Sequence, residues 1–306
     1  TLGVDGGTIK LDGNYPVGTA NVALGDAAGA AITSGGRNTL IGGSAGDALT
    51  SGQRNVVIGT DALSADTQGS RSVAIGQAAL ANQNFTSATD NYNVAVGFQA
   101  GVNVSTGTTN TMIGGFALGS NTTASYNTAV GYQSLYANTT GTGNNALGYQ
   151  ALKTNTTANY NTAFGHVALS LNVTGTENTA VGSQTMYNNT GNNNTAMGGT
   201  ALYANTSGAN NVAMGVQALR YNTTASNNTA VGYQASYANT TGTENASFGR
   251  RALYTNTTGA SNLASGYNSL LSNSTGSYNT ALGSFALTAN TTASYNTAVG
   301  YQGLYA

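Results

Sequence analysis

The chain of 306 residues contains no cysteine, no tryptophan and a single proline, and only 6% of its residues are charged. Without cysteine, the chain has neither disulfides nor cysteine-based metal sites. Eight Lys and Arg against nine Asp and Glu leave a net charge of −1, which excludes the basic surface expected of a nucleic-acid binder. No apolar run approaches the roughly 20 residues of a membrane-spanning helix, so we expect no membrane insertion.

Catalytic and cofactor-binding motifs are also missing. His166 is the only histidine, and it stands where other repeats have Tyr, so we expect it to be a surface variant. No Gly-Lys-Ser/Thr phosphate loop occurs. The chain has no Asp after Asp90, whereas calcium-binding β-rolls need Asp ligands in every repeat. The sequence therefore predicts a protein that is not an enzyme and that uses no cofactor and no metal.

What the chain does contain is a short repeat. A glycine preceded by two small or apolar residues recurs every 17 residues, with one interval of 21 and one of 16. These glycines are Gly25, Gly42, Gly59, Gly76, Gly97, Gly114, Gly131, Gly148, Gly165, Gly182, Gly198, Gly215, Gly232, Gly249, Gly266, Gly283 and Gly300. A fixed period of this length predicts a stack of identical units, and therefore a rod.

Each repeat contains one segment that is typical of a β-strand. Asn127 to Val130 reads Asn-Thr-Ala-Val, with period-2 alternation before the glycine. The segment after the glycine, such as Tyr132 to Ala137, is compatible with a second strand or with one helical turn, and we favour the strand. Stacked about 4.8 Å apart, such repeats form a parallel β-solenoid, an all-β rod of about 17 coils and roughly 80 Å.

An asparagine precedes nearly every predicted strand, four residues before the glycine, and only Ser72 breaks the column. Stacked Asn amides can hydrogen-bond along the rod, so we predict a structural ladder; a simple turn preference is the alternative. The ladder residues are Asn38, Asn55, Asn93, Asn110, Asn127, Asn144, Asn161, Asn178, Asn194, Asn211, Asn228, Asn245, Asn262, Asn279 and Asn296.

A second asparagine recurs in the turn Asn-Thr-Thr-Gly and forms Asn-x-Ser/Thr sequons. If these side chains lie on one exposed face, they can carry a column of N-linked sugars; otherwise the motif is turn chemistry copied with the repeat. The sequons in this phase are Asn121, Asn138, Asn155, Asn172, Asn188, Asn205, Asn222, Asn239, Asn256, Asn273 and Asn290.

Charge divides the chain into three parts. Residues 1–20 are predicted to be a cap or junction, residues 21–90 a first sub-array, and residues 91–306 a second sub-array of the Asn-Thr-Thr-Gly type. The first sub-array carries most acids and an Arg column at Arg37, Arg54 and Arg71, which we expect on a solvated edge. Because the chain stops within a repeat, we expect a processed product or a segment of a longer protein.

Two strand motifs give the repeats a family resemblance. Ser72-Val73-Ala74-Ile75-Gly76 and Asn93-Val94-Ala95-Val96-Gly97 resemble the strand motif of trimeric autotransporter adhesin heads (YadA-like heads) and of related phage tail fibres. This resemblance implies a parallel β-roll, three chains side by side, and an adhesive or receptor-binding shaft. The repeat departs from the family pattern because it is a few residues longer, through the added Asn-Thr-Thr-Gly turn.

Three functions follow as hypotheses. The first is a structural fibre segment, extracellular, on a cell surface or on a virion, which is homotrimeric or stacked end to end and contacts surface glycans or a host receptor. The second is a filament whose N-linked sugars form its outer surface. The third is an ice-binding solenoid, suggested by the Thr pairs, although adjacent Thr in a strand would point to opposite faces.

Overall fold

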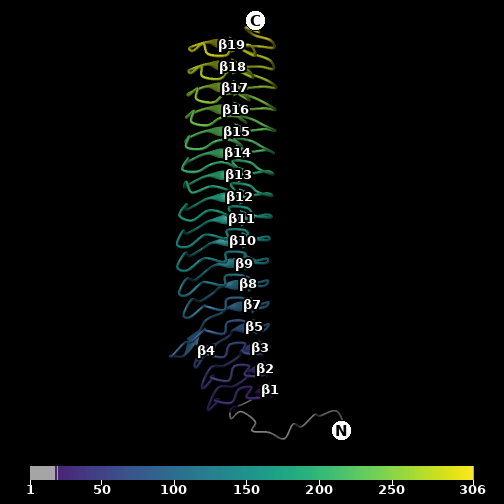
Figure 1. Ribbon diagram of the computed structural model, residues 1–306, viewed down its shortest axis with the longest axis vertical. Coiled ribbons are helices and arrows are strands. Elements are labelled where there is room, and N and C mark those ends of the chain that lie inside the picture. Colours follow the sequence, from purple (N-terminus) through teal and green to yellow (C-terminus); the bar gives the residue numbers. More distant parts are fainter. Residues whose placement is uncertain (1–17, 19, 306) are drawn as a thin grey trace, which may run out of the picture.

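The chain forms a straight rod of stacked coils, the parallel β-solenoid that the repeat predicts (Figure 1). The computed structural model describes Gly18 and residues 20–305, so most of the predicted cap at 1–20 lies outside the described residues. The described part contains no helix, and about 16 turns of about 17 residues separate the first strand from the last. The predicted fold class is confirmed.

Each turn contributes one three-residue strand, and two consecutive turns each add a two-residue strand, which pair with each other beside the rod. The strands are β1 (Val22–Leu24), β2 (Thr39–Ile41), β3 (Val56–Ile58), β4 (Gly69–Ser70), β5 (Val73–Ile75), β6 (Thr89–Asp90), β7 (Val94–Val96), β8 (Thr111–Ile113), β9 (Thr128–Val130), β10 (Asn145–Leu147), β11 (Thr162–Phe164), β12 (Thr179–Val181), β13 (Thr195–Met197), β14 (Val212–Met214), β15 (Thr229–Val231), β16 (Ala246–Phe248), β17 (Leu263–Ser265), β18 (Thr280–Leu282) and β19 (Thr297–Val299).

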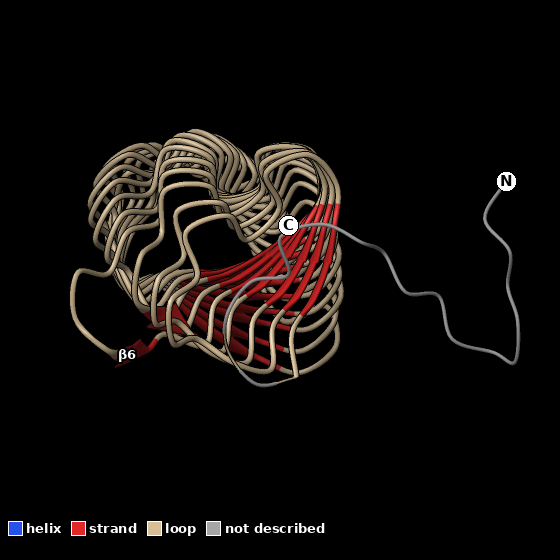
Figure 2. Cartoon of the chain, turned by 90° about the horizontal axis from the view of Figure 1, so that it is seen from below, coloured by secondary structure: helices blue, strands red, loops and turns tan. Residues whose placement is uncertain are grey.

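The long strands make one parallel sheet of 17 strands in which each strand pairs with its copy in the next turn. Thr128 lies opposite Asn145, and Asn145 lies opposite Thr162, so equivalent residues form lines along the rod. The sheet occupies one side of the cross-section, and turns close the rest of each coil (Figure 2). The sheet continues from β5 to β7 across the boundary between the two sub-arrays.

The repeated glycine ends each strand at a corner that no other residue fits. Gly131 has a φ of +128°, and a Cβ placed on it would lie 2.5 Å from the carbonyl oxygen of Gly148 in the next turn. Positive φ and close backbone approach therefore act together at this position. This explains why the glycine is the most regular feature of the repeat.

The strand predicted after the glycine is wrong, because this segment is a run of tight turns. Gln133 and Leu135 have φ values of 53° and 51°, which strands do not adopt, and the Ser134 N–H donates to the Gly131 carbonyl at 3.2 Å. A left-handed conformation costs energy for a leucine. Burial of the Leu135 side chain offsets this cost, since it is fully enclosed in the core.

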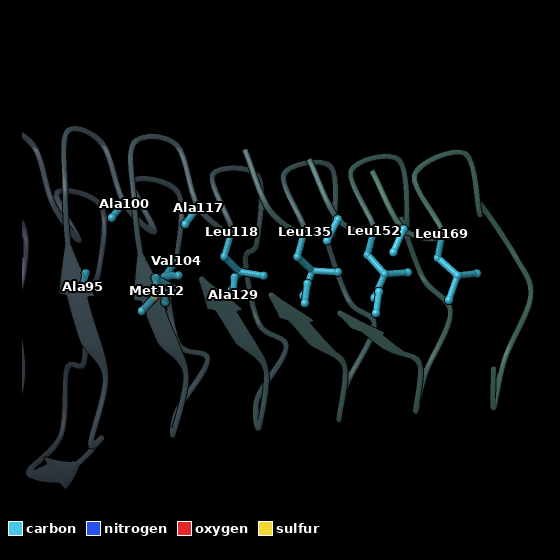
Figure 3. Close-up of a cluster of buried hydrophobic side chains, with 14 of the residues drawn as sticks. Ala95, Ala100, Val104, Met112, Ala117, Leu118, Ala129, Leu135, Leu152 and Leu169 are labelled. Carbon is cyan, nitrogen blue, oxygen red and sulfur yellow. The ribbon is translucent and has the colours of Figure 1, made fainter. Parts of the chain in front are cut away.

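The core is a thin column of small and large apolar side chains (Figure 3). The middle residue of each strand, such as Ala129, faces inward, and the buried leucines Leu118, Leu135, Leu152 and Leu169 lie one above another. The column is broken once, between Ala235 and Ala252. There two buried serines, Ser236 and Ser247, hydrogen-bond to each other at 2.9 Å.

In most turns, either the fourth or the seventh residue after the repeated glycine places a large apolar side chain in the core. Where the fourth residue after the glycine is Gly, the seventh is apolar, and the pairs are Gly29 with Ile32, Gly46 with Leu49, and Gly101 with Val104. A Cβ at Gly46 would lie 2.9 Å from Leu49 Cδ1, so only one large side chain fits. Where the fourth residue is Leu, the seventh is polar, as in the second sub-array.

We expect Gly131→Ala to lower the free energy of unfolding by about 2 kcal/mol or more, because the new Cβ meets the next backbone at a φ that alanine avoids. Urea unfolding followed by circular dichroism measures the change. Gly199→Ala is the matched control, since a Cβ added at Gly199 would have no heavy atom within 4 Å. Equal losses of stability in the two variants would contradict this account of the corner.

Candidate binding faces and the buried asparagine columns

The asparagine before each strand belongs to a first asparagine column, which is buried and bonded to the backbone. The N–H of Asn144 donates to Asn127 Oδ1 at 2.9 Å, and Asn144 Nδ2 donates to the carbonyl of Ala158 at 2.8 Å. The main hydrogen bonds of this column therefore join an asparagine side chain to the backbone. The predicted bonds between two side-chain amides are a minor part of it. The same N–H to Oδ1 link recurs at Asn38, Asn55, Asn110, Asn127, Asn144, Asn161, Asn178, Asn194, Asn211, Asn228, Asn245, Asn262, Asn279 and Asn296.

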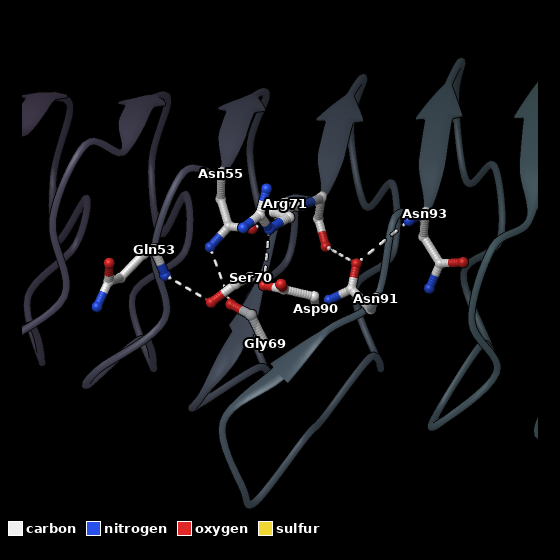
Figure 4. Close-up of polar contacts among 9 residues, drawn as sticks. Gln53, Asn55, Gly69, Ser70, Arg71, Asp90, Asn91 and Asn93 are labelled. Atoms are coloured by element: carbon white, nitrogen blue, oxygen red, sulfur yellow. Dashed lines mark hydrogen bonds and ion pairs between the residues drawn. The ribbon is translucent and has the colours of Figure 1, made fainter.

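The longest turn of the rod repairs the break that Ser72 makes in this column (Figure 4). Ser72 lacks a side-chain amide, and Asn91, one of the extra residues of the next turn, supplies the amide oxygen in its place. Asn91 Oδ1 accepts from Ser72 Oγ at 2.7 Å and from the N–H of Asn93 at 3.2 Å. The inserted strand β6 pairs with β4, and an ion pair of 2.8 Å between Arg71 Nε and Asp90 Oδ1 holds the two together.

Asp66 is a buried carboxyl at the same seam. Its Oδ1 accepts from the N–H groups of Gly69 and Phe85, both at 3.0 Å, and its Oδ2 accepts from Gln83 Nε2 at 2.7 Å. Burial raises the pKa of Asp66 above its ordinary value, although the hydrogen bonds from Gln83, Phe85 and Gly69 act to lower it. Gln83 also accepts from Asn93 Nδ2 at 2.8 Å, so the carboxyl is linked to the first asparagine column.

The asparagines of the Asn-Thr-Thr-Gly turn form a second asparagine column inside the rod, where an exposed face of sugars was predicted. Asn138 Nδ2 donates to Asn121 Oδ1 at 3.1 Å and to the carbonyl of Gly141 at 2.9 Å. The fully buried members are Asn121, Asn138, Asn155, Asn172, Asn189, Asn205, Asn222, Asn239, Asn256 and Asn273, and Asn290 at the upper end is half-buried. A glycan on Nδ2 would displace these bonds and has no room, so the predicted sugar face is wrong for this column.

The prediction is wrong for one further member of the sequon column, Asn188. Asn188 is half-exposed and lies outside the column, and its neighbour Asn189 takes the buried place. Asn205 Nδ2 donates to Asn189 Oδ1 at 2.5 Å, and Asn189 Nδ2 donates to the carbonyl of Gly191. Counting seven residues from Gly182, rather than following the sequon, identifies Asn189 from the sequence.

The outward side of the sheet carries an apolar stripe along the described rod. The residue before each glycine points away from the core, and Leu147, Phe164 and Met197 are 48%, 43% and 47% exposed. The members of this apolar stripe are Leu24, Ile41, Ile58, Ile75, Val96, Ile113, Val130, Leu147, Phe164, Val181, Met197, Met214, Val231, Phe248, Leu282 and Val299, with Ser265 the one polar position. An exposed apolar surface of this extent is typical of a protein–protein interface.

The turns after the glycine carry stacked aromatic side chains. His166 is exposed and lies parallel to Tyr149, with the ring centroids 5.3 Å apart. Tyr149 stacks in turn on Tyr132 at 5.8 Å. The single histidine therefore continues a surface line of aromatic rings.

The threonine pairs lie on a turn whose hydroxyls are partly engaged. Thr139 Oγ1 donates to the carbonyl of Thr156 at 3.1 Å, and Thr223 Oγ1 donates to that of Thr240 at 3.0 Å. The second residue of each pair, such as Thr140, is exposed. Because half of the hydroxyls bond to the rod itself, this edge offers an ice surface fewer free groups than the sequence suggests.

The arginine column lies on an edge of the rod, with Arg37 and Arg54 exposed and Arg71 half-exposed beside Asp90. In the described part of the chain, no three His, Cys, Asp or Glu side chains come together as metal ligands. Nor does that part contain a helix with the length and apolar character needed to cross a membrane. No family model matches the chain, and no curated protein matches it.

We expect Asn161→Ala to lower the free energy of unfolding by about 2 kcal/mol, because it leaves the buried Asn178 N–H without a partner and removes one of the two amide donors to the Gly175 carbonyl. Tyr160→Ala is the control, since Tyr160 is adjacent and 64% exposed. Urea midpoints of both variants provide the comparison. Similar midpoints for the two would show that the first asparagine column adds little to stability.

Proposed function

We propose that the rod is a segment of an adhesive fibre and that copies of the chain associate side by side through the apolar stripe. The observation that carries the proposal is the exposure of this stripe over consecutive strands of the sheet. A water-facing row of Leu, Ile, Val, Phe and Met is costly for a single rod, and a second copy of the same face removes it from water.

The regular geometry of the rod favours a partner with the same repeat. The stripe presents one apolar side chain per turn, about 4.8 Å apart, over about 80 Å. A partner that matches it throughout needs the same spacing, which another copy of this chain has. Three copies are the number implied by the resemblance to trimeric adhesin heads, and the stripe is narrow enough to lie at a threefold axis.

An adhesive role fits a rod that repeats its outer side chains at short intervals. A fibre that presents the same groups in every turn binds many sites at once, so weak single contacts add to a strong attachment. The turns remain free in a side-by-side assembly, and we propose that their Tyr and Thr side chains, with the exposed asparagines outside the two buried columns, contact surface glycans or a host receptor. Such a fibre belongs outside the cell, on its surface or on a virion.

Sedimentation equilibrium tests the assembly. We expect a particle of three times the 30.5 kDa chain mass. Phe164→Glu and Met197→Glu place a charge in the apolar stripe, and the double variant should dissociate because each carboxylate would be buried without a partner. Tyr126→Glu is the matched control, since Tyr126 is 67% exposed on another edge.

A wild-type chain that stays monomeric at all concentrations would overturn the side-by-side assembly. Dissociation of the Tyr126→Glu control to the same extent would show that added charge, rather than its place in the apolar stripe, separates the copies. Circular dichroism of the variants establishes that the rod itself stays folded.

A further inference from the structure

One side of the rod carries a line of tyrosines around a single arginine. The residues lie five or six positions after the repeated glycine, in successive turns from Gly182 to Gly249. We call this set the tyrosine–arginine strip, and its members are Tyr187, Tyr203, Arg220, Tyr221, Tyr237 and Tyr254. It lies on the turns, away from the apolar stripe on the sheet.

The strip is ordered by ring stacking. Tyr187 and Tyr203 are parallel with centroids 5.4 Å apart, and Tyr237 and Tyr254 are parallel with centroids 5.1 Å apart. These distances are close to the spacing of the turns, so the rings stack along the rod. Tyr221 stands at 88° to Tyr237 and is 44% exposed, which gives the strip one ring in a different orientation.

Arg220 links the first tyrosine pair to Tyr221, whose ring in turn contacts Tyr237 of the second pair. Its Cζ lies 6.0 Å from the ring centre of Tyr203 and 5.5 Å from that of Tyr221, within the range of cation–π contacts. Arg251 extends the arrangement, with its Cζ 5.2 Å from the ring centre of Tyr254. The guanidinium groups are therefore held in place before any ligand arrives, which lowers the entropy cost of binding.

The basic and acidic residues of the second sub-array fall at different positions of the repeat. Its basic residues, Lys153, Arg220, Arg250 and Arg251, all follow the repeated glycine by one to five positions. Its acids, Glu177 and Glu244, both lie just before the first asparagine column. Arg220 has no carboxylate partner among the described residues, and its Nε has no hydrogen-bond partner there.

We propose that the tyrosine–arginine strip binds a linear acidic polysaccharide, with Arg220 holding a carboxylate and the tyrosines contacting the sugar rings and hydroxyls. This deepens the proposed adhesive function, on which it rests. Arg220 and Arg251 stand two turns apart, about 10 Å along the rod. Such sparse charge suits a polymer in which acidic and neutral sugars alternate, whereas duplex DNA carries one charge per roughly 1.7 Å.

Isothermal titration calorimetry with hyaluronan decasaccharide tests the proposal, because this probe carries one carboxylate for every second sugar. We expect binding by the wild-type chain and about tenfold weaker binding by Arg220→Gln, the effect of losing one charge-assisted hydrogen bond. Tyr221→Ala should also weaken binding. Arg54→Gln removes the same charge from an exposed edge elsewhere and should bind as the wild type does.

Three results would overturn the proposal that the tyrosine–arginine strip binds an acidic polysaccharide. One is an absence of hyaluronan binding, and another is an equal loss in Arg54→Gln and Arg220→Gln. The third is an affinity for a single-stranded oligonucleotide or for neutral dextran that equals the affinity for hyaluronan. Sedimentation of the same samples separates the two proposals. A trimer that does not bind hyaluronan overturns only the polysaccharide binding. A monomer that binds hyaluronan overturns only the side-by-side assembly.

Discussion

The structure depends on one interaction, the hydrogen bond between a buried asparagine side chain and the backbone of the next turn. A rod this thin has few apolar side chains per coil, and its turns leave many backbone groups inside. Buried N–H and carbonyl groups are costly unless they are bonded. Asn127 Oδ1 accepts the N–H of Asn144 while its Nδ2 donates to the carbonyl of Gly141, so a single side chain satisfies two backbone groups.

The two asparagine columns meet at the same backbone atoms. Asn127 and Asn138 both donate to the carbonyl of Gly141, one from the strand side and one from the turn side. The fixed register of the sheet follows, since a shift by one residue would move both amides away from this carbonyl. The outer faces are then free to vary, and the apolar stripe and the tyrosine–arginine strip lie on different parts of a common frame.

The sequence predicted what repetition and strong local preferences determine. The period, the strand before the glycine and the glycine corner at Gly131 follow from spacing and from the missing Cβ. The turns at Leu135 could not be predicted, because leucine does not favour a positive φ and adopts it here only through burial. The place of Asn138 was missed because Asn-Thr-Thr-Gly is good turn chemistry, whether its asparagine faces water or the core.

Hydrogen exchange of the asparagine side-chain amides, followed by NMR, measures whether the two buried columns keep their hydrogen bonds in solution. Our expectation is slow exchange for the NH₂ groups of the buried members Asn138, Asn144 and Asn189, and fast exchange for the half-exposed Asn188. Exchange of Asn138, Asn144 and Asn189 as rapid as that of Asn188 would contradict it, because the amides would then be open to water and could not hold the turns in register.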